Sequence, residues 1–481
     1  MKVLLINPPP YKIQEAYYDT PPYPRTGLAY LAGSLRATGI EVEVLDCKYD
    51  RINQENALKR IAKLQPNVIG FTGFTNEIMQ SAALAKDVKK KYPHIRTVIG
   101  GVHASVLPER TLREFPDFDY AVIGEGEITI VDLVRALCDN QPTDSIPGVA
   151  RIDAGDNYVY AGDRERVADL DTLSQPAWDL FAPAKEYILH TQRGCPFHCP
   201  FCVNPNGRKV RSESLDSVMR QITTLYTTGC RSILFGDEVF TLKRDRIIDF
   251  CNRMIKSGMH KNLKWWCVTH INSMDYELAV LMRQSGCYRV GLGLESGDED
   301  RLKTINKGTT VEKILTVVSE LKRARLPFEG YFILGQPNET AESAKALIDF
   351  AIKINPNYPV FGIMVPYPGT AIGRMAEEGE QGYRLIAKNW NDYNKQIGNA
   401  VDFRGVERRV LERMQLLGYV KVFLKNYRLL SFFKFCWQYR TNGIAVLKRI
   451  LSHQQVNHAA KSRLSPSIGD KIPMMFQGRN K

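Results

Sequence analysis

Short apolar runs alternate with amphipathic stretches over the first 150 residues of the chain. Runs of five or six apolar residues are typical of buried strands, and apolar residues three or four positions apart are typical of helices. The strands expected on this basis are Lys2–Ile6, Glu41–Asp46, Asn67–Thr72, Arg96–Gly100 and Asp119–Ile123. The helices expected between them are Gly27–Thr38, Asn53–Leu64, Asn76–Lys91 and Glu127–Cys138. The pattern predicts an α/β fold with a parallel, doubly wound (Rossmann-like) sheet.

A second block of alternating strands and helices occupies residues 185–372. Its expected strands are Tyr187–Gln192, Arg231–Phe235, Leu263–Thr269, Arg289–Leu294, Gly330–Leu334 and Val360–Val365. The helices expected between them include Leu215–Thr227, Arg244–Ser257, Tyr276–Gly286 and Val311–Ala324. Six such units predict a partial (β/α)6 barrel, whose chemistry collects at the carboxyl ends of the strands.

The segments outside these two blocks differ in composition. Residues 151–184 are polar and contain Pro176-Ala177-Trp178-Asp179, which is typical of a linker with an aromatic anchor. Residues 373–460 are expected to form a helical C-terminal domain, because Val410–Trp437 is dense in Leu, Phe, Tyr and Val interleaved with basic residues. Residues 461–481 are expected to be a basic, disordered tail. The chain therefore divides into a first domain (1–150), a linker, a barrel (185–372) and a C-terminal region.

The net charge of +13 changes how the C-terminal region is interpreted. From Arg404 to Lys481 there are 16 basic residues against Glu407, Glu412 and Asp470, so this segment carries the whole excess. We interpret it as a domain that closes the barrel, with peripheral membrane contact by its basic aromatic helices as the alternative. Nucleic acid is not expected as a partner, because no binding module accompanies the charge.

Composition also predicts a cytoplasmic location. The first apolar run is too short for a signal peptide, and no stretch approaches the ~18 uncharged apolar residues of a membrane span. Seven of the ten cysteines are scattered singly, which favours a reducing compartment over a disulfide framework.

The other three cysteines form the most informative motif of the chain. Cys195, Cys199 and Cys202 are separated by three and then two residues and follow the first strand of the second block. Thiolates are the usual ligands of iron–sulfur clusters, and three of them on a four-iron cluster leave one iron open. A zinc knuckle that includes His198 is the alternative, although His198 lies between two of the cysteines, where a tetrahedral site would be cramped.

Glycine-rich turns follow the strands of both blocks. Glycine there lets the backbone take positive φ values and approach a ligand closely, at the strand ends where α/β sheets bind ligands. In the first block the turns contain Gly70, Thr72 and Gly73, then Gly100, Gly101 and His103, and then Gly124, Glu125 and Gly126. In the second block they contain Asp237 and Glu238, then Glu295 and Ser296, and then Gly335.

Together these motifs resemble the radical S-adenosylmethionine (SAM) enzymes that carry a cobalamin (B12)-binding domain, the class B methyltransferases among them. The resemblance implies that Cys195, Cys199 and Cys202 hold a [4Fe-4S] cluster whose open iron binds SAM. It implies that the turns of the first block bind cobalamin. The turn Asp46-Cys47-Lys48-Tyr49-Asp50-Arg51 lacks the histidine that ligates cobalt in the methionine synthase type. His103 is the nearest other candidate, and for it we favour a local hydrogen bond.

The resemblance also assigns the SAM contacts. Gly236-Asp237-Glu238 matches the family's Gly-Gly-Glu pattern, whose carboxylate binds the SAM ammonium group. Since successive strand residues point to opposite faces, we expect at most one of these two carboxylates to face SAM. The match to the family's pattern implies that Glu238 is the ligand, and we expect Asp237 to bond the neighbouring loop. Glu295, Ser296 and Gly335 are expected to contact the rest of SAM.

We therefore expect an enzyme that methylates an unactivated carbon of a small molecule through a 5′-deoxyadenosyl radical and methylcobalamin. An external electron donor of the flavodoxin or ferredoxin type is implied. One alternative keeps both cofactors and performs ring formation, ring contraction or another rearrangement without methyl transfer. A second alternative is a non-catalytic corrinoid-binding or zinc-stabilised interaction protein.

Overall fold

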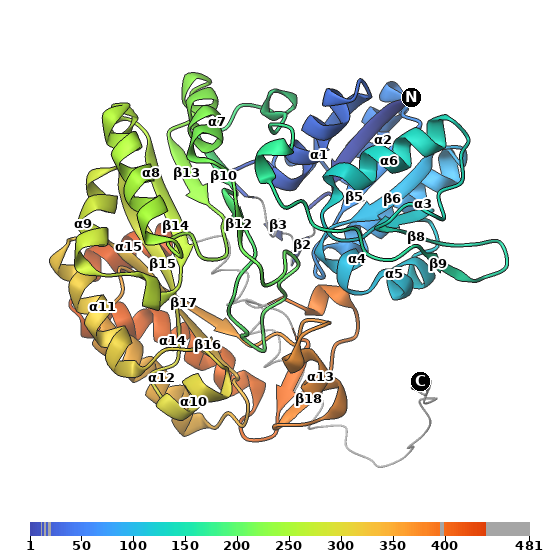
Figure 1. Cartoon of the computed structure of the whole chain (residues 1–481). Helices are drawn as coiled ribbons and strands as arrows, with labels where there is room; N and C mark the ends of the chain where they lie inside the picture. The colour runs from blue at the N-terminus through green and yellow to red at the C-terminus, as the bar shows by residue number, and fades with distance from the viewer. Residues whose placement is uncertain (11, 14–15, 18–20, 395–398, 439–481) are drawn as a thin grey trace, which may run out of the picture.

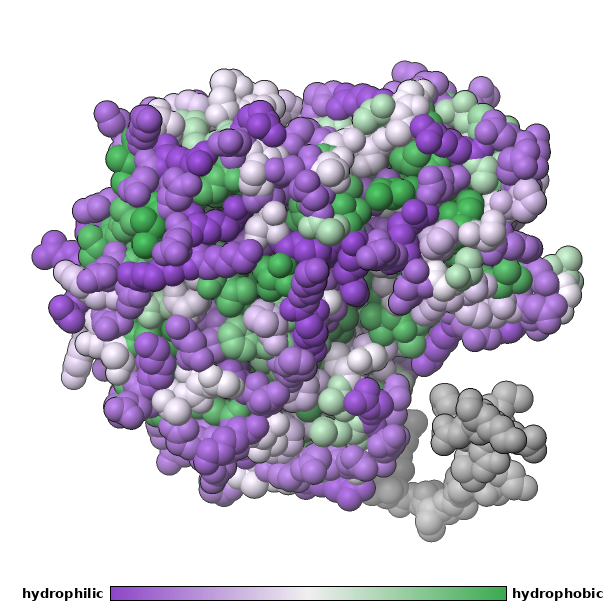
Figure 2. All heavy atoms as spheres, viewed as in Figure 1, coloured by the Kyte–Doolittle hydropathy of each residue, from purple (hydrophilic) through white to green (hydrophobic). Residues whose placement is uncertain are grey.

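The computed structural model describes residues 1–10, 12–13, 16–17, 21–394 and 399–438. Two mainly parallel sheets lie next to each other, and each is flanked by helices (Figure 1). On the face shown in Figure 2, hydrophobic residues form patches separated by hydrophilic ones. The expected tail at 461–481 and the last part of the expected helical domain, 439–460, lie outside the described residues.

The first sheet has the strand order β4-β1-β5-β6-β7-β8-β9. Its strands are β1 (Lys2–Asn7), β4 (Glu41–Asp46), β5 (Val68–Thr72), β6 (Arg96–Gly100), β7 (Tyr120–Val122), β8 (Val149–Ile152) and β9 (Tyr158–Tyr160). The accompanying helices are α1 (Thr26–Ala37), α2 (Gln54–Leu64), α3 (Ile78–Lys91), α4 (Val102–Val106), α5 (Pro108–Glu114) and α6 (Gly126–Cys138). A short hairpin, β2 (Lys12–Ile13) with β3 (Ala16–Tyr17), follows β1. The expected doubly wound sheet is confirmed, with element bounds shifted by one or two residues.

The two faces of β1 enter different cores because its side chains alternate. Val3 and Leu5 belong to the core that contains α1 and α6 and continues into the second sheet. Leu4 and Ile6 belong to a separate core with α2 and α3. The first sheet therefore shares one of its two cores with the second.

The first sheet extends beyond the expected boundary at residue 150. Strands β8 and β9 add to it in antiparallel orientation and reach Tyr160. Residues of β9 are half-buried, and only the first half of β8 is buried. The two strands have only four and three residues and are only partly buried, which is why the pattern assigned this part of the chain to a linker.

The rest of the expected linker packs between the two sheets. The Ala177 N–H donates to the Ala29 carbonyl of α1 at 2.9 Å. The Trp178 ring lies edge-on to Tyr187, with ring centroids 5.1 Å apart. Short 3-10 turns at Leu170–Thr172 and Trp178–Leu180 shape this segment. The predicted aromatic anchor is confirmed, and the segment around it is a fixed connector.

The second sheet has the order β10-β13-β14-β15-β16-β17, and every pair is parallel. Its strands are β10 (Glu186–Leu189), β13 (Ser232–Phe235), β14 (Lys264–Thr269), β15 (Cys287–Glu295), β16 (Phe328–Leu334) and β17 (Tyr358–Ile363). The helices are α7 (Leu215–Thr227), α8 (Arg244–Lys256), α9 (Tyr276–Gln284), α10 (Glu299–Thr304), α11 (Val311–Arg323) and α12 (Ala341–Ile354), with 3-10 turns at Met259–Lys261 and Ile271–Ser273. This confirms the expected partial barrel of six units.

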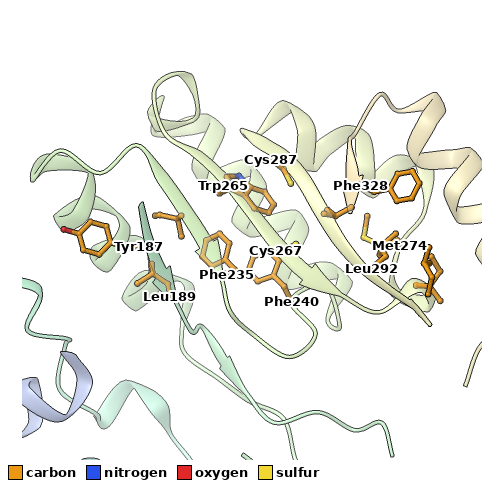
Figure 3. Close-up of a cluster of buried hydrophobic side chains, with 14 of the residues drawn as sticks. Tyr187, Leu189, Phe235, Phe240, Trp265, Cys267, Met274, Cys287, Leu292 and Phe328 are labelled. Atoms are coloured by element: carbon orange, nitrogen blue, oxygen red, sulfur yellow. The ribbon is translucent and has the colours of Figure 1, made fainter. Parts of the chain in front are cut away.

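Aromatic rings fill the layer between strands β13 and β14 and the outer helix α8 (Figure 3). The Phe235 ring stacks on Phe240 at 4.4 Å, and Phe250 and Trp265 meet this pair edge-on or tilted at 5.2 to 5.7 Å. Trp265 is fully buried and its Nε1–H donates to the Ser285 carbonyl at 3.0 Å, so its one polar group is satisfied. This cluster supports the strands whose ends carry the candidate site.

The C-terminal region contains α13 (Ala371–Glu378), the antiparallel pair β18 (Tyr383–Leu385) and β19 (Val401–Phe403), a 3-10 turn at Trp390–Asp392, α14 (Arg408–Lys425) and α15 (Leu429–Gln438). Helix α14 packs against α12 and β17. The expected domain that closes the barrel is thus observed, but it is not purely helical. None of the helices in the described part of the chain is long and apolar enough to cross a membrane.

The contact between α1 and the connector predicts a stability effect. A Cβ added at Gly33 would lie 2.1 Å from the Gln175 carbonyl oxygen, whereas one at Gly27 would meet nothing within 4 Å. Gly33→Val should therefore cost about 1–3 kcal/mol of stability through overpacking. Gly27→Ala in the same helix should be neutral or slightly stabilising. Urea unfolding midpoints measure both, and an unchanged midpoint for Gly33→Val would contradict this packing.

Candidate functional site

The three cysteines lie on a loop between β11 (Gln192–Arg193) and β12 (Arg211–Ser212), which pair antiparallel just beyond β10. The Cys195 N–H donates to the Gly207 carbonyl at 3.0 Å, and Asn204 Nδ2 donates to the carbonyls of Cys195 and Gly207. Gly194 has φ +102°, and a Cβ there would lie 2.4 Å from the Lys209 carbonyl oxygen. The loop is thus held in a conformation that requires glycine at its start.

Positive charges approach these thiols. Burial raises the pKa of Cys195, Cys199 and Cys202, the last to about 11, while Arg208 and Lys307 lower all three. The neighbouring thiols also raise the pKa of Cys199 and Cys202. Iron binding requires thiolates, and the two cations compensate the charge that this creates.

The same thiols fit a four-iron cluster better than a single ion. Among the described residues, no three His, Cys, Asp or Glu side chains converge on one metal position. His198, the fourth ligand of the zinc alternative, is exposed. In a cubane cluster each thiolate binds a different iron, so the sulfur atoms need not converge on one point.

Residues from two other strand ends cover the cysteine loop. The Phe197 ring stacks on His270 at 3.9 Å, and His270 Nε2 lies 3.0 Å from the Lys307 carbonyl oxygen. Asn306 Nδ2 donates to the His198 carbonyl at 3.4 Å. The loop after α10 is therefore part of the site.

Asp237 and Glu238 separate as the pattern predicted. The buried Asp237 carboxylate accepts hydrogen bonds from the Thr191 N–H (2.6 Å) and hydroxyl (2.7 Å) and from the Gln192 N–H (3.1 Å). Glu238 Oε1 accepts from Asn206 Nδ2 at 2.7 Å, but its Oε2 is buried without a hydrogen-bond partner in the described chain. A buried unpaired carboxylate oxygen is rare and is explained by a missing polar ligand.

Glu295 ends β15 in a strained conformation. It has φ +58°, a region that non-glycine residues seldom occupy. Its carboxylate lies 3.0 Å from Lys307 Nζ, and both side chains are buried. Gln336 Nε2 donates to the Glu295 carbonyl at 2.8 Å, while Gln336 Oε1 is another buried atom without a partner among the described residues. Backbone strain of this kind clusters at functional sites.

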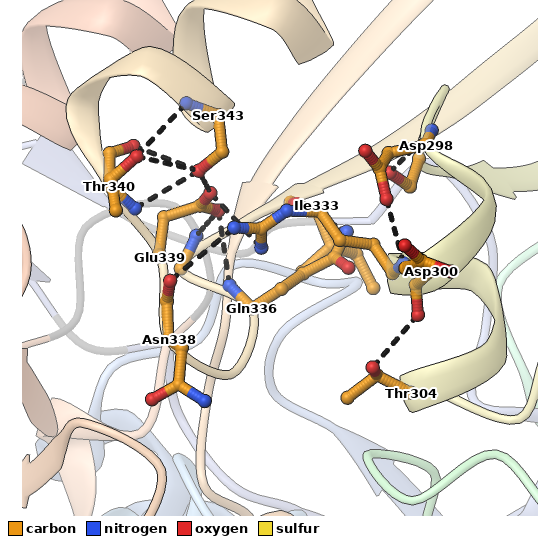
Figure 4. A network of polar contacts seen from close by, with 12 residues as sticks. Asp298, Asp300, Thr304, Ile333, Gln336, Asn338, Glu339, Thr340 and Ser343 are labelled. Carbon is orange, nitrogen blue, oxygen red and sulfur yellow. Dashed lines mark hydrogen bonds and ion pairs between the residues drawn. The ribbon is translucent and has the colours of Figure 1, made fainter.

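The predicted contacts Ser296 and Gly335 are mostly engaged within the chain. The Asp298 N–H donates to the Ser296 hydroxyl at 3.2 Å. The Gly335 N–H donates to Glu339 at 2.9 Å, and its carbonyl accepts from the Tyr383 hydroxyl at 3.0 Å. Figure 4 shows the surroundings of Glu339, whose carboxylate also accepts from the Gln336 N–H and the Ser343 hydroxyl. Because both backbone polar groups of Gly335 already have partners, we expect Gly335 to contact SAM through van der Waals interactions alone.

A cavity of about 260 Å³ opens at the carboxyl ends of the first sheet. Seven of the predicted cobalamin contacts line it, namely Gly70, Thr72, Gly100, Gly101, Gly124, Glu125 and Gly126. The barrel closes the cavity with His190, Arg193, Pro205 and Asn206. The absence of side chains at the glycines leaves room for a ligand that approaches the backbone.

Gly73 and His103 lie behind this wall. The Gly73 N–H donates to the Gly100 carbonyl at 3.3 Å, so this residue supports the turn. His103 is buried against Trp390 with ring centroids 4.7 Å apart, and its Nδ1 lies 3.3 Å from the Thr75 hydroxyl. Burial lowers the pKa of His103 to about 4. The expected local hydrogen bond of His103 is thus observed. His103 was also predicted as a cobalamin contact, but it is not among the residues that line the cavity.

Arginines of the barrel bind the carboxylates of the third glycine turn. Arg193 pairs with Glu127 at 2.5 Å and with Glu125 at 3.6 Å, and Arg211 NH1 donates to Glu125 at 3.0 Å. The Glu125 carboxylate therefore joins the two sheets at the cavity wall. Arg193 directly precedes Gly194 and the cysteine loop, so the cavity and the loop adjoin.

Comparison with known proteins was consistent with this geometry. Residues 14–134 match the B12 binding domain and residues 189–351 match the radical SAM superfamily. The chain is 32% identical over 404 residues to an uncharacterized methyltransferase of Pyrococcus horikoshii, with 82% of this chain and 86% of the relative covered. The chain belongs to the B12-binding radical SAM family. Its cofactors are accordingly a [4Fe-4S] cluster, SAM and cobalamin, and it is an enzyme.

Two further relatives bear on the fold and chemistry of this B12-binding radical SAM enzyme. The anaerobic magnesium-protoporphyrin IX monomethyl ester cyclase of Cereibacter sphaeroides is 29% identical over 368 residues, covering 73% of this chain and 60% of the cyclase. The radical SAM methyltransferase TsrM of Kitasatospora setae, solved with cobalamin and a [4Fe-4S] cluster, superposes with a TM-score of 0.67 at 18% identity, covering 88% of each chain. This superposition supports the fold.

Several residues of the site escaped the sequence analysis. Arg193, Arg211, Asn206, Lys307 and Gln336 all contact predicted site residues. Lys307 and Gln336 stand beside glycines at strand or loop ends, which is a usable signal. Arg193 and Asn206 also stand beside glycines, but no local pattern identifies the partners of Arg193, Arg211 and Asn206, which lie 32 to 86 positions away.

A buried acid near the site predicts a pH effect on stability. Burial raises the pKa of Glu213 to about 7, and Gln221 Nε2 donates to its carboxylate at 2.6 Å. Because the folded state holds this proton more tightly than the unfolded state, the stabilisation is complete below pH ~4.5 and is lost as pH rises through ~7. Between pH 5.5 and pH 8 the loss amounts to about 2 kcal/mol.

Glu213→Gln should remove this part of the pH dependence, measured by urea unfolding at the two pH values. Glu165→Gln, which changes an exposed carboxylate, is the control. An unaltered pH dependence in the Glu213 variant would show that the carboxylate is ionised in the folded protein at pH 5.5.

Proposed function

We propose that the protein is a cobalamin-dependent radical SAM methyltransferase that methylates an unactivated carbon of a small molecule. The observation that carries this proposal is the position of Arg193. Its side chain lines the cavity at the glycine turns, and its backbone leads directly into the cysteine loop. A substrate that binds between the cavity and the cysteine loop can contact both cofactors.

When bound, the cluster with SAM supplies a radical that removes a hydrogen atom, and cobalamin supplies the methyl group. The protein holds and separates these groups. Cys195, Cys199 and Cys202 hold the cluster, and an external electron donor of the flavodoxin or ferredoxin type reduces it. The glycine turns that line the cavity hold the corrinoid.

Glu238 is the residue that we assign to the SAM ammonium group. Its free, buried Oε2 accepts a hydrogen bond, while Asn206 fixes the other oxygen. Asp237 positions the chain before the cysteine loop through Thr191 and Gln192. Lys307, paired with Glu295 beside the thiols, offers a fixed positive charge for the anionic groups of the site.

The second candidate function is ring closure or another rearrangement without methyl transfer. The likeness to the cyclase of Cereibacter sphaeroides over 73% of this chain favours it. The two functions differ in the fate of SAM. A methyltransferase converts one SAM to S-adenosylhomocysteine and another to 5′-deoxyadenosine, while a rearranging enzyme needs only the second conversion.

The products of SAM therefore test the proposal without knowledge of the substrate. The anaerobically reconstituted protein, given methyl-labelled SAM and a reductant, should release S-adenosylhomocysteine up to about one equivalent of bound corrinoid, together with 5′-deoxyadenosine. Cys199→Ala should abolish deoxyadenosine formation because the cluster loses a ligand. Cys138→Ala, at an exposed cysteine on α6, is the matched control. Deoxyadenosine without S-adenosylhomocysteine would favour rearrangement.

A second test concerns the two adjacent carboxylates. Removing a charge-assisted hydrogen bond costs about 1.5–3 kcal/mol, so Glu238→Gln should weaken SAM binding roughly ten- to hundredfold. Asp237→Asn should weaken SAM binding less and destabilise the fold more, because its partners are backbone and side-chain donors of the barrel. SAM titration of the cluster absorbance, at equal iron content, measures the ranking. The opposite ranking would assign the ammonium group to Asp237.

A further inference from the structure

The outward side of the last two described helices is unusually apolar. The described chain has twelve exposed large hydrophobic residues, and seven of them lie in the 21-residue stretch from residue 417 to residue 437. We name them the C-terminal apolar face, which comprises Leu417, Leu424, Tyr427, Leu429, Leu430, Phe433 and Trp437. Concentration on this scale marks an interaction surface, since exposed hydrophobic residues elsewhere are scattered.

Helix α15 is apolar on two sides. On its inner side Phe432 and Phe435 contact Phe423, with ring centroids 6.1 and 5.4 Å apart. On its outer side Leu430 is 81% exposed and Phe433 is 66% exposed. A helix that is hydrophobic all round is normally covered on both sides. The inner side satisfies this expectation within the protein, and the outer side requires a partner.

The charge around this face indicates the partner. Lys425 and Lys434 are exposed beside it, and Lys421 is half-exposed. The sequence contains no Asp or Glu from residue 413 to residue 469, and the whole positive excess of the chain lies beyond residue 403. The surface that complements this face is therefore both apolar and anionic.

We propose that the C-terminal apolar face docks on an anionic lipid surface. Trp, Tyr and Phe side chains favour the boundary between headgroups and acyl chains, and lysines extend their ammonium groups to the phosphates. Helix α15 has ten residues, or about 15 Å, so it lies in the plane of the interface and does not span it. The protein is thereby held at a membrane surface, where apolar substrates are concentrated.

The other occupants fit the charge less well. A second copy would bring two basic faces together. Residues 439–481 of the same chain contain eight basic residues and one acidic residue, so they offer the lysines no partner charges. Anionic lipid satisfies both the lysines and the hydrophobic side chains.

One tryptophan of the face gives a direct readout. Trp178, Trp265, Trp266 and Trp390 are buried, whereas Trp437 is 71% exposed. The full-length protein, prepared anaerobically, is mixed with vesicles of phosphatidylcholine that contain or lack phosphatidylglycerol. Anionic vesicles should shift the tryptophan emission to the blue, and lipids with a nitroxide near the headgroup should quench it. Trp437→Phe should remove both signals while vesicle sedimentation still reports binding.

Paired variants separate charge from apolar contact. Lys425→Glu with Lys434→Glu should lower the partition coefficient on anionic vesicles at least about tenfold. Leu430→Ser with Phe433→Ser should lower this partition coefficient by a similar factor. It should also reduce the quenching of tryptophan emission at low salt. Lys86→Glu with Lys90→Glu, which reverses two exposed lysines on α3, is the matched control and should lower it much less. Iron content and uncoupled SAM cleavage should remain unchanged in all variants.

Three results would overturn the proposal. Equal binding to neutral and anionic vesicles, or none to either, would remove the lipid partner. A dimer in light scattering that Leu430→Ser with Phe433→Ser dissociates, without vesicle binding, would assign the face to a second copy. Protection of Trp437 from acrylamide without vesicles or dimerisation would assign it to residues 439–481. None of these readouts depends on catalysis, so failure here is distinguishable from failure of the proposed methyl transfer.

Discussion

The ion pairs between Arg193 and Arg211 of the barrel and Glu125 and Glu127 of the first domain connect the two halves of the candidate site. All four side chains are at most 12% exposed. A buried charge without its partner is strongly destabilising, so the two sheets cannot separate here without a large cost. Because Arg193 lies at the base of the cysteine loop and Glu125 lies in the cavity wall, this interaction fixes the cysteine loop next to the cavity.

Around this connection the protein retains features that would be unfavourable in a purely structural region. Glu295 adopts a left-handed conformation, and polar atoms of Glu238 and Gln336 are buried without partners in the described chain. Each feature has an energetic cost, and all three lie at carboxyl ends of barrel strands near the cysteine loop. Their concentration there is typical of a functional site and agrees with the proposed position of SAM.

The C-terminal region combines two roles that are physically distinct. Helix α14 closes the barrel through buried contacts such as the Gln415 Nε2 bond of 2.7 Å to the Phe361 carbonyl. The outer side of α14 and the outer side of α15 carry apolar and basic side chains that are exposed. The same segment can therefore stabilise the fold with one side and present an interaction surface with the other.

The sequence alone determined the parallel strands of both sheets, most of the helices between them and the cysteine loop, because each depends on local patterns. Buried parallel strands are continuous apolar runs, and ligand turns require glycine at fixed places. Strand alternation indicated that only one of Asp237 and Glu238 faces SAM, and the resemblance to the family's pattern favoured Glu238. Strands β8 and β9 were missed because they have only four and three residues and are only partly buried.

Only the tertiary structure decided which distant residues meet. Arg193 and Glu127, Lys307 and Glu295, and His103 and Trp390 become neighbours through packing of separate elements. In the tertiary structure Arg193 lines the cavity, whereas His103 does not. Contacts of this kind depend on the relative placement of two sheets and a C-terminal region, and no local pattern of side chains records that placement.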